Sequence, residues 1–230
     1  MKHPGFSTCT IALLGILAST APGFAGDSGF YLSGKGGPTY LNVGNIQASS
    51  GGVLHDSSAA NLIGAFGMAG GYTWLRQGLP LRTELEFMNR TEVTYDSSPM
   101  FNGSVRNYGI ASTEQNVSAM LKGYWYLPFG DPERMSPFVS GGFGISRNAV
   151  KGDLTPIGGG SPIHFSDATL HPAWTAGVGV SFYLGNNVVN DVELRYVDLG
   201  SADWGIVGAP TLHSNAVQGG ELSFALRYNF

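Results

Sequence analysis

Eight segments of this chain alternate apolar side chains with polar or small ones at every second residue, a pattern that favours β-strands. The segments cover residues 30–37, 61–74, 81–95, 116–127, 137–145, 174–184, 190–197 and 213–230. The alternation is most regular at the C-terminus, where one face carries Leu222, Phe224, Leu226, Tyr228 and Phe230 and the other carries Glu221, Ser223, Ala225, Arg227 and Asn229. A chain built from such strands folds as a β-sandwich or as a membrane β-barrel.

The connections between the segments alternate in length, and this decides between the two architectures. Short pieces at residues 76–80, 128–137 and 185–189 alternate with long polar links centred near residues 44–60, 96–115, 147–172 and 198–213. Outer-membrane barrels have short turns at one end and long loops at the other, whereas Greek-key sandwiches have no such regularity. We therefore predict an all-β fold, an eight-stranded antiparallel transmembrane β-barrel with periplasmic termini and four extracellular loops.

Aromatic residues gather where the even-numbered segments end, beside a short turn or the chain terminus. Amphipathic rings favour the depth of the lipid headgroups, so a girdle of such rings is expected at a barrel rim. The predicted girdle consists of Tyr72, Trp74, Trp125, Phe182, Tyr228 and Phe230.

The face opposite the apolar one carries charges of both signs. These inward positions are Lys35, Arg82, Glu84, Glu86, Arg90, Glu92, Lys122, Asp191, Glu193, Arg195, Glu221 and Arg227, which are six cations and six anions. Side chains nearly fill the interior of an eight-stranded barrel. We therefore predict a packed, self-neutralising ion-pair network with a structural role. The alternative is the lining of a narrow porin-like path for small solutes.

The N-terminus has the features of a secretory signal peptide. Lys2 precedes an apolar core at residues 11–18, and small residues stand at positions 23 and 25. We predict that residues 1–25 are the signal peptide and that residues 26–230 form one barrel domain. Cys9, the sole cysteine, lies within the signal peptide, so the mature chain has no thiol for a disulfide or a nucleophile.

Composition narrows the classes further. Without Lys2, the 12 basic residues become 11 against 16 acidic ones, a formal net charge of −5 that gives no indication of a nucleic-acid partner. No apolar run after the signal peptide approaches the roughly 18–20 residues of a membrane-spanning helix.

Histidine and serine supply the candidates for chemistry. His55, His164, His171 and His213 fall in or at the edges of the predicted loops, where a haem or metal site is one alternative, although their spacing matches no ligand motif. The pair His213-Ser214, with Glu221 downstream, invites comparison with lipid A deacylases. Eight strand residues separate Glu221 from His213 by about 27 Å, which opposes a catalytic set. We expect no catalytic residue, no cofactor and no metal.

The segments GFYLSGKGG, NVSAMLKGYWYL, PFVSGGFGI, DVELRYVDLG and ELSFALRYNF resemble the small outer-membrane proteins grouped as opacity proteins and rickettsial-type major surface antigens. The transmembrane domain of OmpA is a more distant relative. This resemblance implies an eight-stranded barrel in the bacterial outer membrane whose exposed loops vary and contact hosts or the environment.

We therefore expect a non-enzymatic, monomeric surface protein. The expected partners are outer-membrane lipid and lipopolysaccharide, a host surface ligand, and the barrel-assembly machinery, which would recognise the terminal Phe230. The alternatives left open are a narrow porin, a lipid A-modifying enzyme and a haem- or metal-binding surface protein.

Overall fold

The structure is a computed structural model that describes residues 29–48, 59–97, 108–129, 134–156, 161–185, 187–204 and 212–230. Its strands are β1 (Phe30–Ala48), β2 (Ala59–Thr73), β3 (Leu81–Ser97), β4 (Tyr108–Tyr126), β5 (Met135–Pro156), β6 (Ile163–Tyr183), β7 (Val188–Asp198), β8 (Ala202–Trp204) and β9 (Leu212–Asn229). One short 3-10 turn, η1 (Leu75–Gln77), joins β2 to β3. Within the described ranges, no helix is long and apolar enough to cross a membrane.

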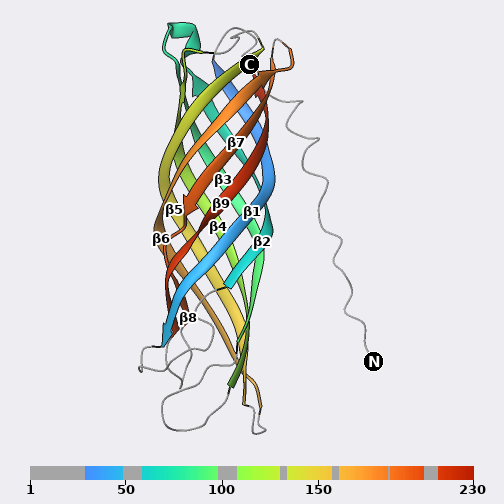
Figure 1. Ribbon diagram of the computed structural model, residues 1–230, viewed down its shortest axis with the longest axis vertical. Helices are drawn as coiled ribbons and strands as arrows, with labels where there is room; N and C mark the ends of the chain where they lie inside the picture. The colour runs from blue at the N-terminus through green and yellow to red at the C-terminus, as the bar shows by residue number, and fades with distance from the viewer. Residues whose placement is uncertain are drawn as a thin grey trace, which may run out of the picture.

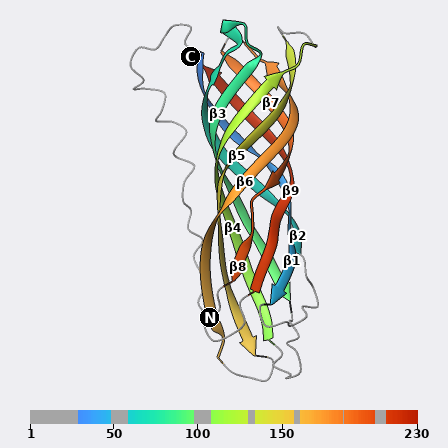
Figure 2. The same cartoon turned by 90° about the vertical axis from the view of Figure 1, so that its left-hand side faces the viewer.

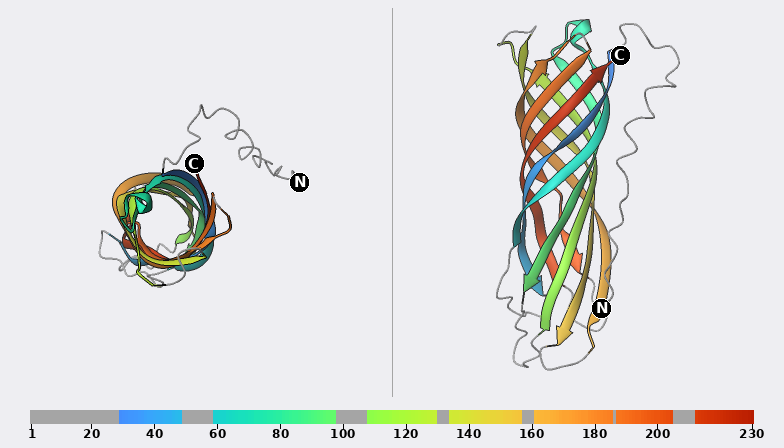
Figure 3. Two further views of the ribbon diagram at one scale, coloured as in Figure 1. Left: turned by 90° about the horizontal axis from the view of Figure 1, so that it is seen from above. Right: turned by 90° about the vertical axis from the view of Figure 1, so that its right-hand side faces the viewer.

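The strands close into a barrel. Each strand from β1 to β6 pairs with the next one along the chain, β7 pairs with β9, and β9 pairs back with β1. Seen from above, the ribbons form a ring, and the C-terminus lies at the same end as η1 (Figures 1 and 3). The predicted antiparallel barrel is confirmed.

The short strand β8 does not add a ninth position to the wall. Asp198 pairs with Gln218 and Ala202 pairs with Ser214, so β8 continues the β7 ladder along β9 in unchanged register. Figure 2 shows β8 beside the part of β9 that lies away from the C-terminus. The interruption contains Gly200, whose φ of 80° is a left-handed conformation that favours glycine. The barrel therefore has the predicted eight strand positions.

The two faces of the sheet differ in polarity as the alternation predicts. Large apolar side chains point outward, and Phe66 and Leu194 are 54% and 60% exposed. Charged side chains such as Arg82 and Glu84 point into the lumen and are buried. A soluble sandwich would bury its apolar face, whereas here that face forms the outer wall, as it does in a lipid-embedded barrel.

One β-bulge in β3 makes part of the predicted pattern wrong. Arg90 pairs with Asn116 but Val93 pairs with Glu114, so β3 contains one residue more than β4 across this step. An extra residue inverts the inward and outward positions beyond it. Glu92, predicted to face the lumen, is exposed, and Val93, assigned to the lipid face, is 2% exposed inside the barrel.

The strands also extend further than the alternation predicts. The ladder between β5 and β6 continues to the pair Leu154–Ile163, so most of the predicted loop at 147–172 is a paired hairpin. β1 likewise continues to Ala48, and β4 begins at Tyr108. The alternation of hydrophobicity in the sequence fades in these parts, while backbone pairing continues. Residues 1–28, including the predicted signal peptide, lie outside the described residues.

The wall is paired less completely between β2 and β3. Their ladder runs from Thr73–Arg82 to Ala65–Arg90. Beyond the bulge, the described residues of β2 pair with β1 and those of β3 pair with β4. The backbone N–H of Gly64 donates instead to the Thr91 hydroxyl at 3.0 Å. The bulge thus ends the pairing between these two strands.

Candidate functional site

The lumen contains most of the charged residues that the alternation assigns to the inner face. Eleven of the twelve predicted positions lie there and are at most 8% exposed: Lys35, Arg82, Glu84, Glu86, Arg90, Lys122, Asp191, Glu193, Arg195, Glu221 and Arg227. We call Arg82, Asp191 and Arg227, which lie toward the end of the barrel with η1 and the C-terminus, the basal layer. The other eight residues form the central layer.

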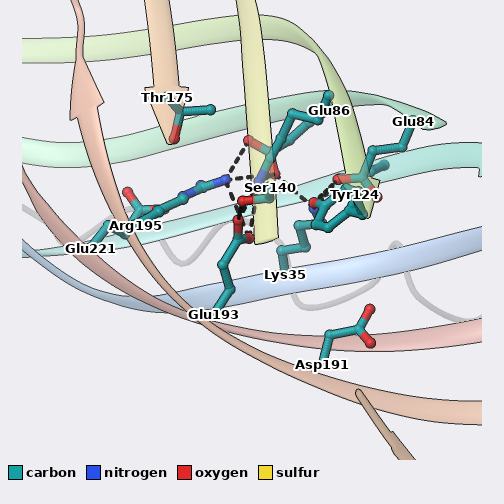
Figure 4. A network of polar contacts seen from close by, with 12 residues as sticks. Lys35, Glu84, Glu86, Tyr124, Ser140, Thr175, Asp191, Glu193, Arg195 and Glu221 are labelled. Atoms are coloured by element: carbon teal, nitrogen blue, oxygen red, sulfur yellow. Dashed lines mark hydrogen bonds and ion pairs between the residues drawn. The ribbon is translucent and has the colours of Figure 1, made fainter. Parts of the chain in front are cut away.

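In the central layer, Lys35 of β1 lies between two carboxylates of β3. Its Nζ forms ion pairs with Glu84 and, at 2.7 Å, with Glu86 Oε2. Tyr31 Oη donates to Glu84 Oε2 at 2.8 Å, and Tyr124 Oη of β4 donates to the other carboxylate oxygen. Three donors therefore surround Glu84. Figure 4 shows Lys35 directed toward Glu84 and Glu86, and it compensates both carboxylates.

Arg195 of β7 connects β3 to β9 across the same layer. Its Nη1 lies 2.8 Å from both carboxylate oxygens of Glu86, and its Nε lies 2.8 Å from Glu221 Oε1. The other oxygen of Glu221 accepts a hydrogen bond from Arg90 Nε at 3.0 Å. Such charge-assisted pairs fix the relative positions of strands that are distant in the sequence.

Two inward glycines make room for the long cations. A Cβ at Gly142 would lie 2.6 Å from Cγ of Lys122, and one at Gly177 would lie 2.8 Å from Cβ of Arg195. Lys122 can therefore cross the lumen, and its Nζ lies 2.9 and 3.0 Å from the two oxygens of Glu193. The central layer holds four cations and four carboxylates and is neutral. Removing one partner of such a buried pair would leave an uncompensated charge.

The basal layer has a different composition. Arg82 Nη1 lies 2.5 Å from Asp191 Oδ2, and Arg227 Nε lies 3.3 Å from the same oxygen. The Arg82 guanidinium also stacks on the ring of Tyr124, with its carbon 3.8 Å from the centroid. Two cations thus share one carboxylate. Because Glu92 lies outside, the described lumen residues include six cations and five anions, and the predicted balance of six and six is wrong for this part of the chain.

Above the central layer, toward the far end of β1, the lumen becomes uncharged in its described residues. Asn116 donates to Ser146 and Asn148, and Asn148 Nδ2 donates to the backbone oxygens of Leu199 (3.0 Å) and Ser201 (2.7 Å). Beyond these amides lie apolar side chains that are at most 3% exposed: Leu41, Val43, Val93, Val150, Leu199 and Val217. Side chains therefore occupy the lumen above the charged layers as well.

The predicted girdle residues lie on the outer wall near the short-turn end. Tyr72 contacts Trp74 edge-to-face with ring centroids 4.9 Å apart, and Tyr228 contacts Phe230 at 5.4 Å. The remaining girdle residues, Trp125 and Phe182, are 51% and 39% exposed.

A second group of outward aromatic residues escaped the sequence analysis. Tyr40 of β1 and Tyr196 of β7 both pair with Gly220 of β9, which places them in one row across the wall. Trp174 of β6 extends the row, because its ring centroid lies 5.2 Å from that of Tyr196. These three residues mark the other edge of the apolar wall. The alternation in the sequence already places Trp174 and Tyr196 on the outer face. The girdle prediction did not include them because it considered only rings beside a short turn or the chain terminus.

The histidines do not form one site within the described residues. His164 is exposed and forms a pair with Asp153 across the β5–β6 ladder. His171, seven residues away on β6 and so about 23 Å along the strand, lies 3.1 Å from Ser201 Oγ. His55 and the side chain of His213 lie outside the described part. In that part, no group of three or more potential metal ligands occurs.

The sequence pair His213-Ser214 does not come together with Glu221. Glu221 points into the central layer, where it binds Arg195 and Arg90. In the backbone of β9, His213 lies eight residues from Glu221, about 27 Å along the strand. The residues that would form a deacylase-like set are thus separated by their places in the sheet.

Comparisons with known proteins agree with this architecture. A family model for the outer membrane protein beta-barrel domain matches residues 10–230. The chain is similar to outer membrane protein PagN of Salmonella typhimurium (strain LT2), with 25% identity over 204 residues, 85% of this chain and 83% of PagN. Among solved structures it is similar to OprG of Pseudomonas aeruginosa, with a TM-score of 0.50 and 13% identity over 89% of this chain and 99% of OprG. Neisserial surface protein A gives a TM-score of 0.45 and 18% identity, with 89% of this chain and 99% of that chain covered. Together with the lipid-facing wall, the family match shows that the chain belongs to the outer membrane protein beta-barrel family and is a protein of the bacterial outer membrane.

Proposed function

We propose that this protein is a non-enzymatic surface protein whose packed barrel anchors four extracellular connections that contact a host or environmental ligand. The proposal includes a monomeric barrel surrounded by outer-membrane lipid and lipopolysaccharide, with Phe230 recognised during assembly.

The observation that carries the proposal is the hairpin of β5 and β6, which continues beyond the apolar wall. Ile145 and Leu170 are the last large apolar side chains that are exposed in the described part of these strands. Beyond the pair Arg147–Leu170 the exposed side chains are mostly polar, and the ladder continues to the pair Leu154–Ile163, about 23 Å further along the strand at roughly 3.3 Å per residue. A paired sheet with polar outward side chains supports a role as a rigid support for surface contacts.

The filled lumen supports anchoring over transport. A solute path would have to break the central ion pairs, since side chains nearly fill an eight-stranded interior. The separation of Glu221 from His213-Ser214 supports a non-enzymatic role.

The test replaces the four connections at residues 49–58, 98–107, 157–160 and 205–211 with Gly/Ser segments of equal length. Wild-type and variant chains are displayed on a non-adherent strain and tested for binding to cultured epithelial cells and immobilised matrix proteins. We expect wild-type binding to fall to the level of the empty strain in the variant.

Two controls separate loss of contact from loss of the barrel. Heat-modifiable mobility on a gel must be retained, because it reports a folded barrel independently of the loops. Replacing one connection at a time identifies the contact segment. Full binding by a folded chain without its four connections, or no binding by the wild type, would contradict the proposal. A change in lipid A mass on expression would contradict the non-enzymatic part.

A further inference from the structure

We infer that the basal layer is a binding site for one small inorganic anion of the chloride class. The site lies at the periplasmic end of the lumen, between Thr73, Arg82 and Arg227, and it is independent of the surface role proposed above. The inference rests on charge, on buried donors without acceptors, and on the aromatic rings that surround the two arginines.

The charge in this layer is unbalanced. Arg82 and Arg227 are 1% and 2% exposed and both form their ion pairs with Asp191. The nearest set of carboxylates is already engaged, because Lys35 pairs with Glu84 and Arg195 with Glu86. A second positive charge held out of water is costly unless a counter-charge accompanies it. Among its described side chains, the layer therefore carries one positive charge in excess.

Buried donors without an acceptor lie at the same place. Nε of Arg82 and the hydroxyl of Thr73 have no hydrogen-bond partner among the described residues, whereas Nε of Arg227 faces Asp191 Oδ2 at 3.3 Å. Thr73 and Arg82 are directly paired in the β2–β3 ladder, so these two donors are neighbours on the inner face. A water molecule could accept two such bonds but would leave the charge uncompensated. An anion satisfies both requirements.

The aromatic rings determine which direction remains open around the arginines. The Arg82 guanidinium carbon lies 3.8 Å from the Tyr124 centroid, and that of Arg227 lies 5.2 Å from the Tyr31 centroid. Rings interact with the faces of guanidinium groups, which leaves the N–H edges for an acceptor in the plane. Asp191 occupies one such edge of each arginine and is itself oriented by Ser181 Oγ at 2.6 Å. Arg227 faces Asp191 through its Nε edge, so the Nε edge of Arg82 is the one that remains.

The size of the anion follows from the barrel. An eight-stranded interior is filled by side chains, so a phosphate or a carboxylate ligand would have to displace some of them. A monatomic halide needs the least space and places no demand on geometry. Since the layer lies next to η1 and the C-terminus, the anion would enter from the periplasmic end.

The experiment measures thermal unfolding of the purified, detergent-folded barrel while gluconate is exchanged for chloride at constant ionic strength. We expect a saturable rise in the unfolding temperature with chloride. Line broadening of the 35Cl NMR signal on adding protein gives a direct measure of binding. A matched control, Glu92→Gln, removes an exposed charge outside the lumen and should keep both effects.

Two variants test the assignment to this site. Arg82→Gln removes the surplus charge, and Thr73→Asp supplies a carboxylate opposite Arg82, so both should lose the chloride-dependent shift and the line broadening. Thr73→Asp should in addition unfold at least as high as wild type in gluconate, so the test holds even if Arg82→Gln fails to fold. No chloride effect in the wild type, or an effect retained in Thr73→Asp, would overturn the inference.

Discussion

At the scale of single residues, the central layer shows how an outer-membrane barrel keeps charges in its interior. Arg195 contacts carboxylates from two other strands, Glu86 and Glu221. Desolvation of each charge is offset by its partners, so the set is stable only while it is complete. Such a layer links strands across the lumen and excludes water at the same time.

We predict that Arg195→Met lowers the free energy of unfolding by about 3–5 kcal/mol, because two buried carboxylates lose a partner. Urea unfolding of the lipid-reconstituted barrel, followed by tryptophan fluorescence, measures the change. The comparison variant is Glu92→Gln, an exposed substitution that should stay within about 0.5 kcal/mol of wild type. Equal effects of the two variants would argue against the network described here.

At the scale of elements, the bulge in β3 determines which residues enter the lumen beyond Arg90. The extra residue directs Val93 inward and Glu92 outward. Bulges of this kind commonly occur where pairing ends, and here the β2–β3 ladder stops at the same point. One inserted residue thus changes both which side chains line the lumen and where strand pairing in the barrel wall ends.

Cysteine accessibility tests this register. In a background with no other cysteine after Cys9, Glu92→Cys should react with a membrane-impermeant maleimide on intact cells, whereas Val93→Cys should not. Denatured samples of both variants should label fully, which controls for expression. Stronger labelling of Val93→Cys than of Glu92→Cys would show that β3 alternates regularly past Arg90, and it would contradict the bulge.

At the scale of the whole molecule, the barrel combines a lipid-facing wall, two groups of aromatic residues and a filled lumen. The wall is bounded by the girdle around Tyr72 and Trp74 at the short-turn end and by Tyr40, Trp174 and Tyr196 at the other edge. Rings at both edges fix the depth of a barrel in a bilayer. The ends of the strands beyond the second group are then held outside the membrane.

We predict that the purified protein forms no stable, defined channel in planar bilayers, because the charged layers and the apolar side chains above them fill the lumen. Conductance recordings at several voltages check this. The same protein sample must show heat-modifiable mobility on a gel, so that an absence of channel openings is not caused by unfolded protein. Reproducible unitary openings would favour the narrow-porin alternative.

The terminal strand gives a prediction about assembly. If, as proposed, the barrel-assembly machinery recognises Phe230, deleting it or replacing it with Ala should lower the amount of folded barrel in the outer membrane several-fold. Quantification by heat-modifiable gel shift of membrane fractions measures this. Phe224→Ala, an outward substitution inside β9, serves as the comparison and should have the smaller effect.

The sequence by itself determined the class of fold, the closure of eight strand positions and most of the lumen. Each of these follows from the period of two, because a strand offers only two faces and one of them must meet lipid. Eleven inward charges, from Lys35 in β1 to Arg227 in β9, obey that parity.

Other features could be found only in the tertiary structure, because the alternation of inward and outward residues does not specify them. The bulge between Arg90 and Val93 depends on pairing with β4, and it excludes Glu92 from the lumen. The extension of β5 and β6 depends on backbone hydrogen bonds that leave no hydrophobic pattern. The sharing of Asp191 by Arg82 and Arg227 depends on which strands face each other across the lumen. Local alternation specifies the face that a side chain occupies, whereas its partners are set by the closed sheet.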